Sequence, residues 1–205
     1  DGWKFGLGVA IQHDREHDVD SGGVGNYEWA GVFSTRFSVD PKDGRIVVYM
    51  GDDERFEYVY KFVSKARYQP GKSDTAQLLD DGTLYVARFE EDGSGQWLPL
   101  RHGERFAKGA LSSEAGFHNQ GDVVIRCRQA ADIAGATPMD RPEWIAVHPV
   151  SGEVYVTLTN NSERGKTDRV GPDAANPRAQ NIHGHIVRWR EADGDATALR
   201  FNWDI

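Results

Sequence analysis

Residues 44–49 read GRIVVY, residues 82–87 read GTLYVA and residues 152–157 read GEVYVT, and these three runs decide the fold class. Each run begins at a glycine that follows a turn-forming stretch, and continues with β-branched and aromatic residues. Glycine, proline, aspartate and serine favour turns, whereas β-branched and aromatic side chains favour strands. Three copies of one turn-and-strand unit, spaced tens of residues apart, predict an all-β, propeller-like fold.

Oxygen-bearing side chains follow each of the three runs. They are Asp52 and Asp53, Glu90 and Glu91, and Asn160 and Asn161. Equivalent strand ends of a propeller meet at one rim of its channel, so we expect these side chains to gather there. Carboxylate and amide oxygens suit hard cations such as Ca²⁺. The pattern therefore predicts a cation site at one rim.

The composition excludes several classes of function. The 205 residues carry a formal net charge of −8, and no basic stripe offers a surface for nucleic acid. No apolar run is long enough to span a membrane, and the single cysteine, Cys127, cannot form an internal disulfide. The chain opens without a signal peptide and closes in strand-like sequence. We expect residues 1–205 to be part of a single β-propeller domain, truncated at both ends and monomeric.

One segment has a helical period. Val123, Val124, Cys127, Ala131 and Ala134 fall on one face of a helix, with Asp122 near its start and Gly135 just past its end. This spacing predicts one inserted α-helix near residues 119–134. Cys127 on its apolar face is expected to be a small buried hydrophobe.

The segment DRPEW at residues 140–144 is a candidate for chemistry. Proline disfavours the α conformation in the residue before it, so Arg141 is expected to be extended. In an extended segment Arg141 and Glu143 would point the same way. Arginine offers a planar fork for a phosphate or carboxylate, and the glutamate offers a ligand or a base. The alternative is a strand entrance joined by a salt bridge.

Two further motifs carry two interpretations each. Adjacent Asp52 and Asp53 repel one another unless a cation compensates them, but an isolated pair of aspartates is usually a solvated turn. His183 and His185 could share a face and bind a transition metal. A structural hydrogen bond at a strand entrance is the favoured alternative, since no third ligand stands beside them.

Several of these segments together resemble the PhoX family of secreted alkaline phosphatases and their uncharacterised relatives. They are residues 49–64 (YMGDDERFEYVYKFVS), 81–89 (DGTLYVARF), 139–143 (MDRPE), 154–161 (VYVTLTNN), 176–178 (NPR) and 184–186 (GHI). The resemblance runs in the family's order from about residue 37 to the end of the chain.

The resemblance implies a β-propeller that carries iron and calcium at one end of its channel and hydrolyses phosphate monoesters. It implies Asp53 and Glu143 as metal ligands, Arg141 as a phosphate contact, and Glu28 as the candidate for a further glutamate ligand. It also implies a periplasmic or secreted location. The family's cysteine ligand to iron comes from an upstream segment, so Cys127 does not correspond to it.

The leading hypothesis is therefore part of a metal-dependent phosphate monoester hydrolase, in which this fragment alone is inactive. Its substrates would be small-molecule phosphate monoesters. Two alternatives remain open: a non-catalytic calcium-binding propeller, and a calcium-dependent propeller lactonase or esterase. Arg141 favours the phosphatase, because a phosphate site needs such a residue and a structural calcium site does not.

Overall fold

The fold is known from a computed structural model, which describes residues 3–6, 9–12, 27–30, 36–40, 45–69, 77–148 and 150–205. Side chains are described for residues 46–69, 78–148 and 150–205. The strands are β1 Trp3–Gly6, β2 Val9–Gln12, β3 Tyr27–Ala30, β4 Arg36–Asp40, β5 Arg45–Met50, β6 Arg55–Glu57, β7 Tyr60–Ser64, β8 Gly82–Phe89, β9 Ser94–Pro99, β10 Arg105–Phe106, β11 Gly109–Ala110, β12 Met139–Asp140, β13 Pro142–Val147, β14 Val154–Leu158, β15 His185–Glu191 and β16 Arg200–Asp204. The α-helices are α1 Gln120–Ile125 and α2 Cys127–Ala134, and short 3₁₀ turns cover Gln77–Leu79, Ser113–Ala115 and Ala192–Gly194.

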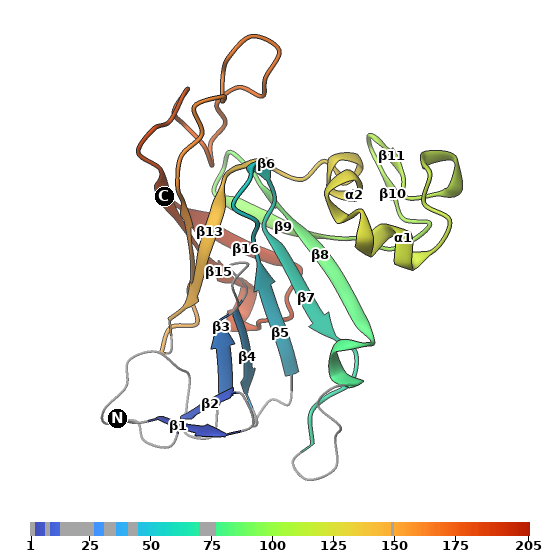
Figure 1. Cartoon of the computed structure of the whole chain (residues 1–205), viewed down its shortest axis with the longest axis vertical. Coiled ribbons are helices and arrows are strands. Elements are labelled where there is room, and N and C mark those ends of the chain that lie inside the picture. The colour runs from blue at the N-terminus through green and yellow to red at the C-terminus, as the bar shows by residue number, and fades with distance from the viewer. Residues whose placement is uncertain are drawn as a thin grey trace.

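Two antiparallel meanders make one curled sheet (Figure 1). Its order is β1-β2-β3-β4-β5-β7-β8-β9-β16-β15-β14-β13, so the first meander runs to β9 and the second returns from β16 to β13. The meanders join where β16 pairs with β9, with Phe201 opposite Gly95. β6 leaves this sheet and pairs instead with β12. The prediction of an all-β, propeller-like fold is confirmed, whereas the assignment of residues 1–205 to a single truncated domain stays a prediction.

The three glycine-led runs of the sequence are strands β5, β8 and β14. All neighbouring pairs between β5 and β14 are antiparallel. Every second strand of such a sheet runs in the same direction. One strand separates β5 from β8 and three strands separate β8 from β14, so all three run the same way. Their C-terminal ends therefore lie at the same end of the sheet, as the repeat predicted.

Aromatic residues fill the inside of the curl. The Trp97 and Trp189 rings lie 5.9 Å apart between centroids, and Tyr49 meets Trp189 edge to face at 5.6 Å. Alternate residues face the other way: Tyr85 and Ala87 belong to this inner core, whereas Val86 between them packs under the helices. This period of two is what a sheet covered on both faces requires.

A buried ion pair lies inside the same core. Lys61 Nζ on β7 is 3.2 Å from Glu191 Oε1 on β15, and both side chains are almost fully buried. The ammonium also donates to the carbonyls of Ala196 and Ala198, and Trp97 Nε1 donates to Glu191. Burial lowers the pKa of Lys61 to about 8, although the Glu191 carboxylate opposes that shift. The pair connects the first meander to the second across the interior.

The helical insertion covers the outside of β8 and β9 (Figure 1). The prediction of one helix near residues 119–134 is right in place but wrong in continuity, because Arg126 leaves helical geometry at φ −110° and ψ 42° and separates α1 from α2. The Arg126 guanidinium packs over the Phe117 ring, 4.5 Å from its centroid. Val124, expected on the apolar face, is 48% exposed, since it lies one residue beyond the buried Val123. Cys127, predicted to be a small buried hydrophobe, is partly buried and packs against the outer core.

We expect Glu191→Ala to lower the free energy of unfolding by about 3–5 kcal/mol, because it leaves the Lys61 ammonium buried without a counter-charge. Replacing both residues, as Lys61→Met with Glu191→Leu, removes the lone charge and should recover part of that loss, because Trp97 Nε1 still loses its acceptor. Urea unfolding followed by circular dichroism measures both. Asp81→Ala, which breaks the exposed Lys65–Asp81 pair, is the control and should change stability little. A Glu191→Ala variant as stable as this control would contradict the prediction.

Candidate functional site

The end of β5, in the first meander, meets the start of β13, in the second. Gly51, which follows β5, lies against Pro142 at the start of β13: a Cβ added to Gly51 would come within 2.9 Å of the Pro142 carbonyl oxygen. A few residues later β6 pairs with β12, which places Arg55 opposite Asp140. Glycine at position 51 thus permits a close approach of two backbones that a larger residue would prevent. The approach brings the Asp52-Asp53 segment beside residues 140–143.

Arg141 joins three strand ends through its guanidinium. Its Nη2 lies 2.9 Å from Asp53 Oδ2, and its Nη1 donates to Asn160 Oδ1 at 3.2 Å. Thr159 adds a hydrogen bond from its hydroxyl to Asp53 Oδ1 at 3.3 Å, and its backbone N–H donates to the Arg141 carbonyl. The ends of the first and third repeats therefore meet, as predicted. Glu90, from the second repeat, pairs instead with Arg88 at 2.6 Å.

The backbone of Arg141 corrects the sequence analysis. Its φ is 57°, in the left-handed region, whereas the following proline predicted an extended residue. Phe56, on the strand that pairs with β12, has a similar φ of 63°. Left-handed geometry costs a residue with a side chain roughly 1–2 kcal/mol, so surrounding contacts must hold Arg141 in place. The side-by-side orientation inferred for Arg141 and Glu143 from an extended backbone therefore loses its basis.

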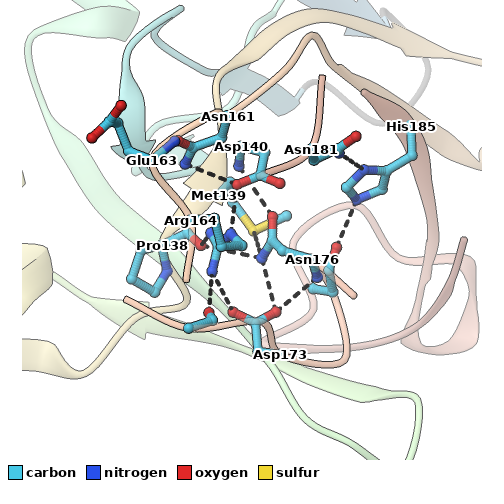
Figure 2. Close-up of polar contacts among 12 residues, drawn as sticks. Pro138, Met139, Asp140, Asn161, Glu163, Arg164, Asp173, Asn176, Asn181 and His185 are labelled. Carbon is cyan, nitrogen blue, oxygen red and sulfur yellow. Dashed lines mark hydrogen bonds and ion pairs between the residues drawn. The ribbon is translucent and has the colours of Figure 1, made fainter. Parts of the chain in front are cut away.

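Those contacts come from a polar network of the buried residues Asp140, Asn161, Arg164 and Asn176 with the partly exposed Asp173 (Figure 2). Arg164 is wholly buried, and its Nε donates to Asp140 Oδ1 at 2.6 Å. Asn161 Nδ2 donates to the same oxygen at 3.0 Å, and the backbone N–H of Asp140 donates to Asn176 Oδ1 at 3.0 Å. The other oxygen, Asp140 Oδ2, is buried and has no hydrogen-bond partner among the described residues. We call these five residues the Asp140 network.

His185 lies beside this network (Figure 2). Its Nε2 is 2.8 Å from the Ala175 carbonyl oxygen, and its Nδ1 is 3.2 Å from Asn181 Nδ2. Burial lowers the pKa of His185, which favours the neutral ring that donates from Nε2 and accepts at Nδ1. Both ring nitrogens are thus engaged, which supports the structural interpretation over transition-metal binding.

The comparisons with known proteins agree with this geometry. The family described as "Alkaline phosphatase PhoX" matches residues 29–205. The chain belongs to the PhoX family. A solved structure of Pseudomonas fluorescens PhoX in complex with vanadate, a transition state analogue, is 45% identical, with a TM-score of 0.71 over 82% of this chain. The chain spans 29% of the length of that protein. No curated protein matches.

Of the three metal ligands that the PhoX resemblance implied, Asp53 and Glu143 have described side chains and Glu28 does not. Asp53 lies at the rim, and Glu143 is half-buried on β13, directly after the Pro142 that touches Gly51. Glu28 lies on β3, but its side chain is outside the described residues. In the part of the chain with described side chains, no three His, Cys, Asp or Glu residues form a group of metal-binding size. None of the described helices has the length and hydrophobicity to span a bilayer.

Sequence reasoning missed the residues beneath Arg141. Asp140 was noted only as the start of the DRPEW segment, and Arg164, Asp173 and Asn176 lie in a polar stretch that resembles an ordinary surface loop. Asp140 and Asn176 fell in segments that resembled PhoX, whereas Arg164 and Asp173 did not. Nothing in the local pattern distinguishes a buried arginine in a loop from an exposed one.

Gly184, which precedes His185, gives a test of how tightly this region is packed. Its φ is 71°, and a Cβ there would come within 2.0 Å of the Leu158 carbonyl oxygen. Gly152 has the same conformation, with φ 70°, but nothing lies within 4 Å of its Cβ position. Gly152→Ala should cost only the left-handed strain, about 1–2 kcal/mol. Gly184→Ala should cost about 1–3 kcal/mol more, from the clash. Equal losses in chemical denaturation would show that the packing around Gly184 is loose.

Proposed function

We propose that this chain is part of a metal-dependent phosphate monoester hydrolase, with Arg141 as its phosphate contact. The observation that carries the proposal is the placement of the Arg141 fork at the rim, in a PhoX-family chain whose 45% identical relative was solved with vanadate. A planar guanidinium with two N–H edges suits the oxygens of a phosphoryl group.

Energetics favour this role over a salt-bridged strand entrance. The Arg141 and Asp53 side chains are 25% and 39% exposed, and an ion pair open to solvent contributes only about 0.2–1 kcal/mol. The left-handed backbone of Arg141 costs roughly 1–2 kcal/mol. The ion pair alone does not offset that cost. Strain of this kind, held by a buried network, is typical of residues placed for function.

The described rim offers oxygen donors that suit calcium. Asp53 accepts hydrogen bonds at both carboxylate oxygens, yet an ionised carboxylate has about four acceptor positions and keeps room for a cation. We propose Asp53 and Glu143 as metal ligands and Glu28 as a third candidate. Calcium and iron are the proposed metals; when bound they would neutralise charge on the phosphate and activate an oxygen nucleophile. Cys127 packs with the outer core, under the helices and not at the rim, so iron would need ligands from other parts of the protein.

The whole protein is proposed to act on small-molecule phosphate monoesters in the periplasm or outside the cell, as a monomer and without nucleic-acid or membrane partners. The chain alone is expected to be inactive or nearly so, because it offers an incomplete set of ligands and an incomplete shell leaves a metal misplaced. A full-length protein that binds one calcium tightly but hydrolyses no phosphate ester would favour the non-catalytic propeller. Hydrolysis of lactones or carboxylic esters alone would favour the lactonase.

Arg141→Ala in the full-length protein should lower kcat for a phosphate monoester by roughly 10²–10³-fold, the usual effect of removing one donor that stabilises transition-state charge. Metal content should stay the same, because arginine does not ligate cations. Steady-state kinetics and elemental analysis measure the two effects. Arg188→Ala is the matched control, since Arg188 pairs with Asp204 on β16. Full activity in Arg141→Ala would remove the phosphate-contact role.

Asp53→Asn and Glu143→Gln should each weaken calcium binding by at least roughly 10–100-fold. Removing a group that only orients a metal ligand already costs that much. Both substitutions keep the shape of the side chain and delete its charge. Calcium titration of the full-length apoprotein gives the affinities, with Asp204→Asn as a carboxylate control on β16. Wild-type affinity in both variants would exclude these two residues as ligands.

A further inference from the structure

We propose that the buried Asp140–Arg164 ion pair positions Arg141 for the phosphate, so that Asp140 and Arg164 are positioning residues of the reaction. This inference rests on the function proposed above and extends it to residues that touch neither substrate nor metal. Its starting observation is that two fully buried, oppositely charged side chains form an ion pair, and that one of them, Asp140, directly precedes the left-handed Arg141 in the chain.

Asp140 is fixed on both its side chain and its backbone. Its Oδ1 accepts from Arg164 Nε and Asn161 Nδ2, and its N–H donates to Asn176 Oδ1. Arg141 follows directly, and its own carbonyl accepts from the Thr159 N–H. The peptide between residues 140 and 141 is therefore held on both sides. This restraint fixes the direction in which the Arg141 side chain leaves the backbone, which is toward Asp53 and Asn160.

Arg164 connects this peptide to the long loop between β14 and β15. Its Nη2 donates to the Pro138 carbonyl at 2.6 Å, and its Nη1 donates to the Gly171 carbonyl at 2.8 Å and lies 3.2 Å from Asp173 Oδ2. One guanidinium thus joins the residues before Arg141 to the middle of the loop. A lysine, with a single ammonium group, could not reach all of these acceptors in the same geometry.

Stability alone does not account for the pair. A buried ion pair is often no more stabilising than apolar residues of similar volume, because both charges lose their hydration. What apolar residues cannot supply is direction, since the Arg164 guanidinium binds four acceptors at once. A pair that is dispensable for folding but needed for geometry is what a positioning role requires.

The test therefore neutralises the pair instead of breaking it. Asp140→Asn combined with Arg164→Met removes both charges, so no lone buried charge remains and the full-length protein is expected to fold. Its kcat/KM for 4-nitrophenyl phosphate should fall by at least about tenfold, in keeping with the rate losses that follow small misplacements. The same two changes in an Arg141→Ala background should cost less than about twofold, because the residue they position is already gone.

Lys61→Met with Glu191→Leu is the matched control. It neutralises the other buried ion pair, which lies in the inner core and not among the contacts of Arg141, and it should leave kcat/KM unchanged. If the Asp140 and Arg164 double variant does not fold, Asn161→Ala replaces it. That change deletes one hydrogen bond to Asp140 and should give a smaller loss that likewise disappears in the Arg141→Ala background.

Equal losses with and without Arg141 would overturn the positioning role, as would wild-type kcat/KM in the double variant. A wild-type protein with no phosphatase activity would instead contradict the proposed function. The crystal structure of the variant then decides the inference by itself. An Arg141 Nη2 that stays at its present 2.9 Å from Asp53 Oδ2 overturns it, and a guanidinium turned away from Asp53 supports it.

Discussion

The pairing of β16 with β9 is the constraint on which the rest of the structure depends. It joins two meanders that are otherwise separate in the order of the sheet, and the candidate site lies across them. Asp53 follows a strand of the first meander, whereas Arg141 and Asn160 flank strands of the second. The Lys61–Glu191 pair also connects the two meanders, but it lies in the inner core and not among the contacts of Arg141. A shift of one meander against the other would separate Asp53 from Arg141 while leaving every strand intact.

Around Arg141, backbone strain and stabilising contacts fall on different residues. Arg141, in contact with solvent, is strained, whereas Asp140, Asn161, Arg164 and Asn176 are fully buried and hydrogen bonded. Arg141 is therefore supported from below by buried, hydrogen-bonded residues. The outer helices add to this support, because Arg128 on α2 pairs with Glu57 on β6 at 2.9 Å and donates to the Arg55 carbonyl. β6 is the strand that holds β12, so the insertion supports the peptide before Arg141.

The sequence predicted those features that depend on local patterns. The glycine-led runs marked β5, β8 and β14, and their shared direction followed from the alternation of an antiparallel sheet. Arg141 was recognised as a candidate, but its conformation was not, because a tertiary network outweighs the local preference of a residue before proline. The break at Arg126 was hidden for a similar reason: the contact with Phe117 is not part of a helical period. Arg164 could not be found from the sequence, and the burial of Asn176 could not either, since burial in a loop is a property of the whole fold.

The β9–β16 ladder also has a consequence for how the protein is made. Gly95 and its partner Phe201 are more than 100 positions apart in the chain. At a synthesis rate of roughly 5–20 residues per second, the edge of β9 waits on the order of 5–20 s on the ribosome before its partner strand exists. An unpaired strand edge is a template for pairing with other chains. During that time the nascent first meander presents an unpaired edge to other chains, and a chaperone that covers this edge would protect it.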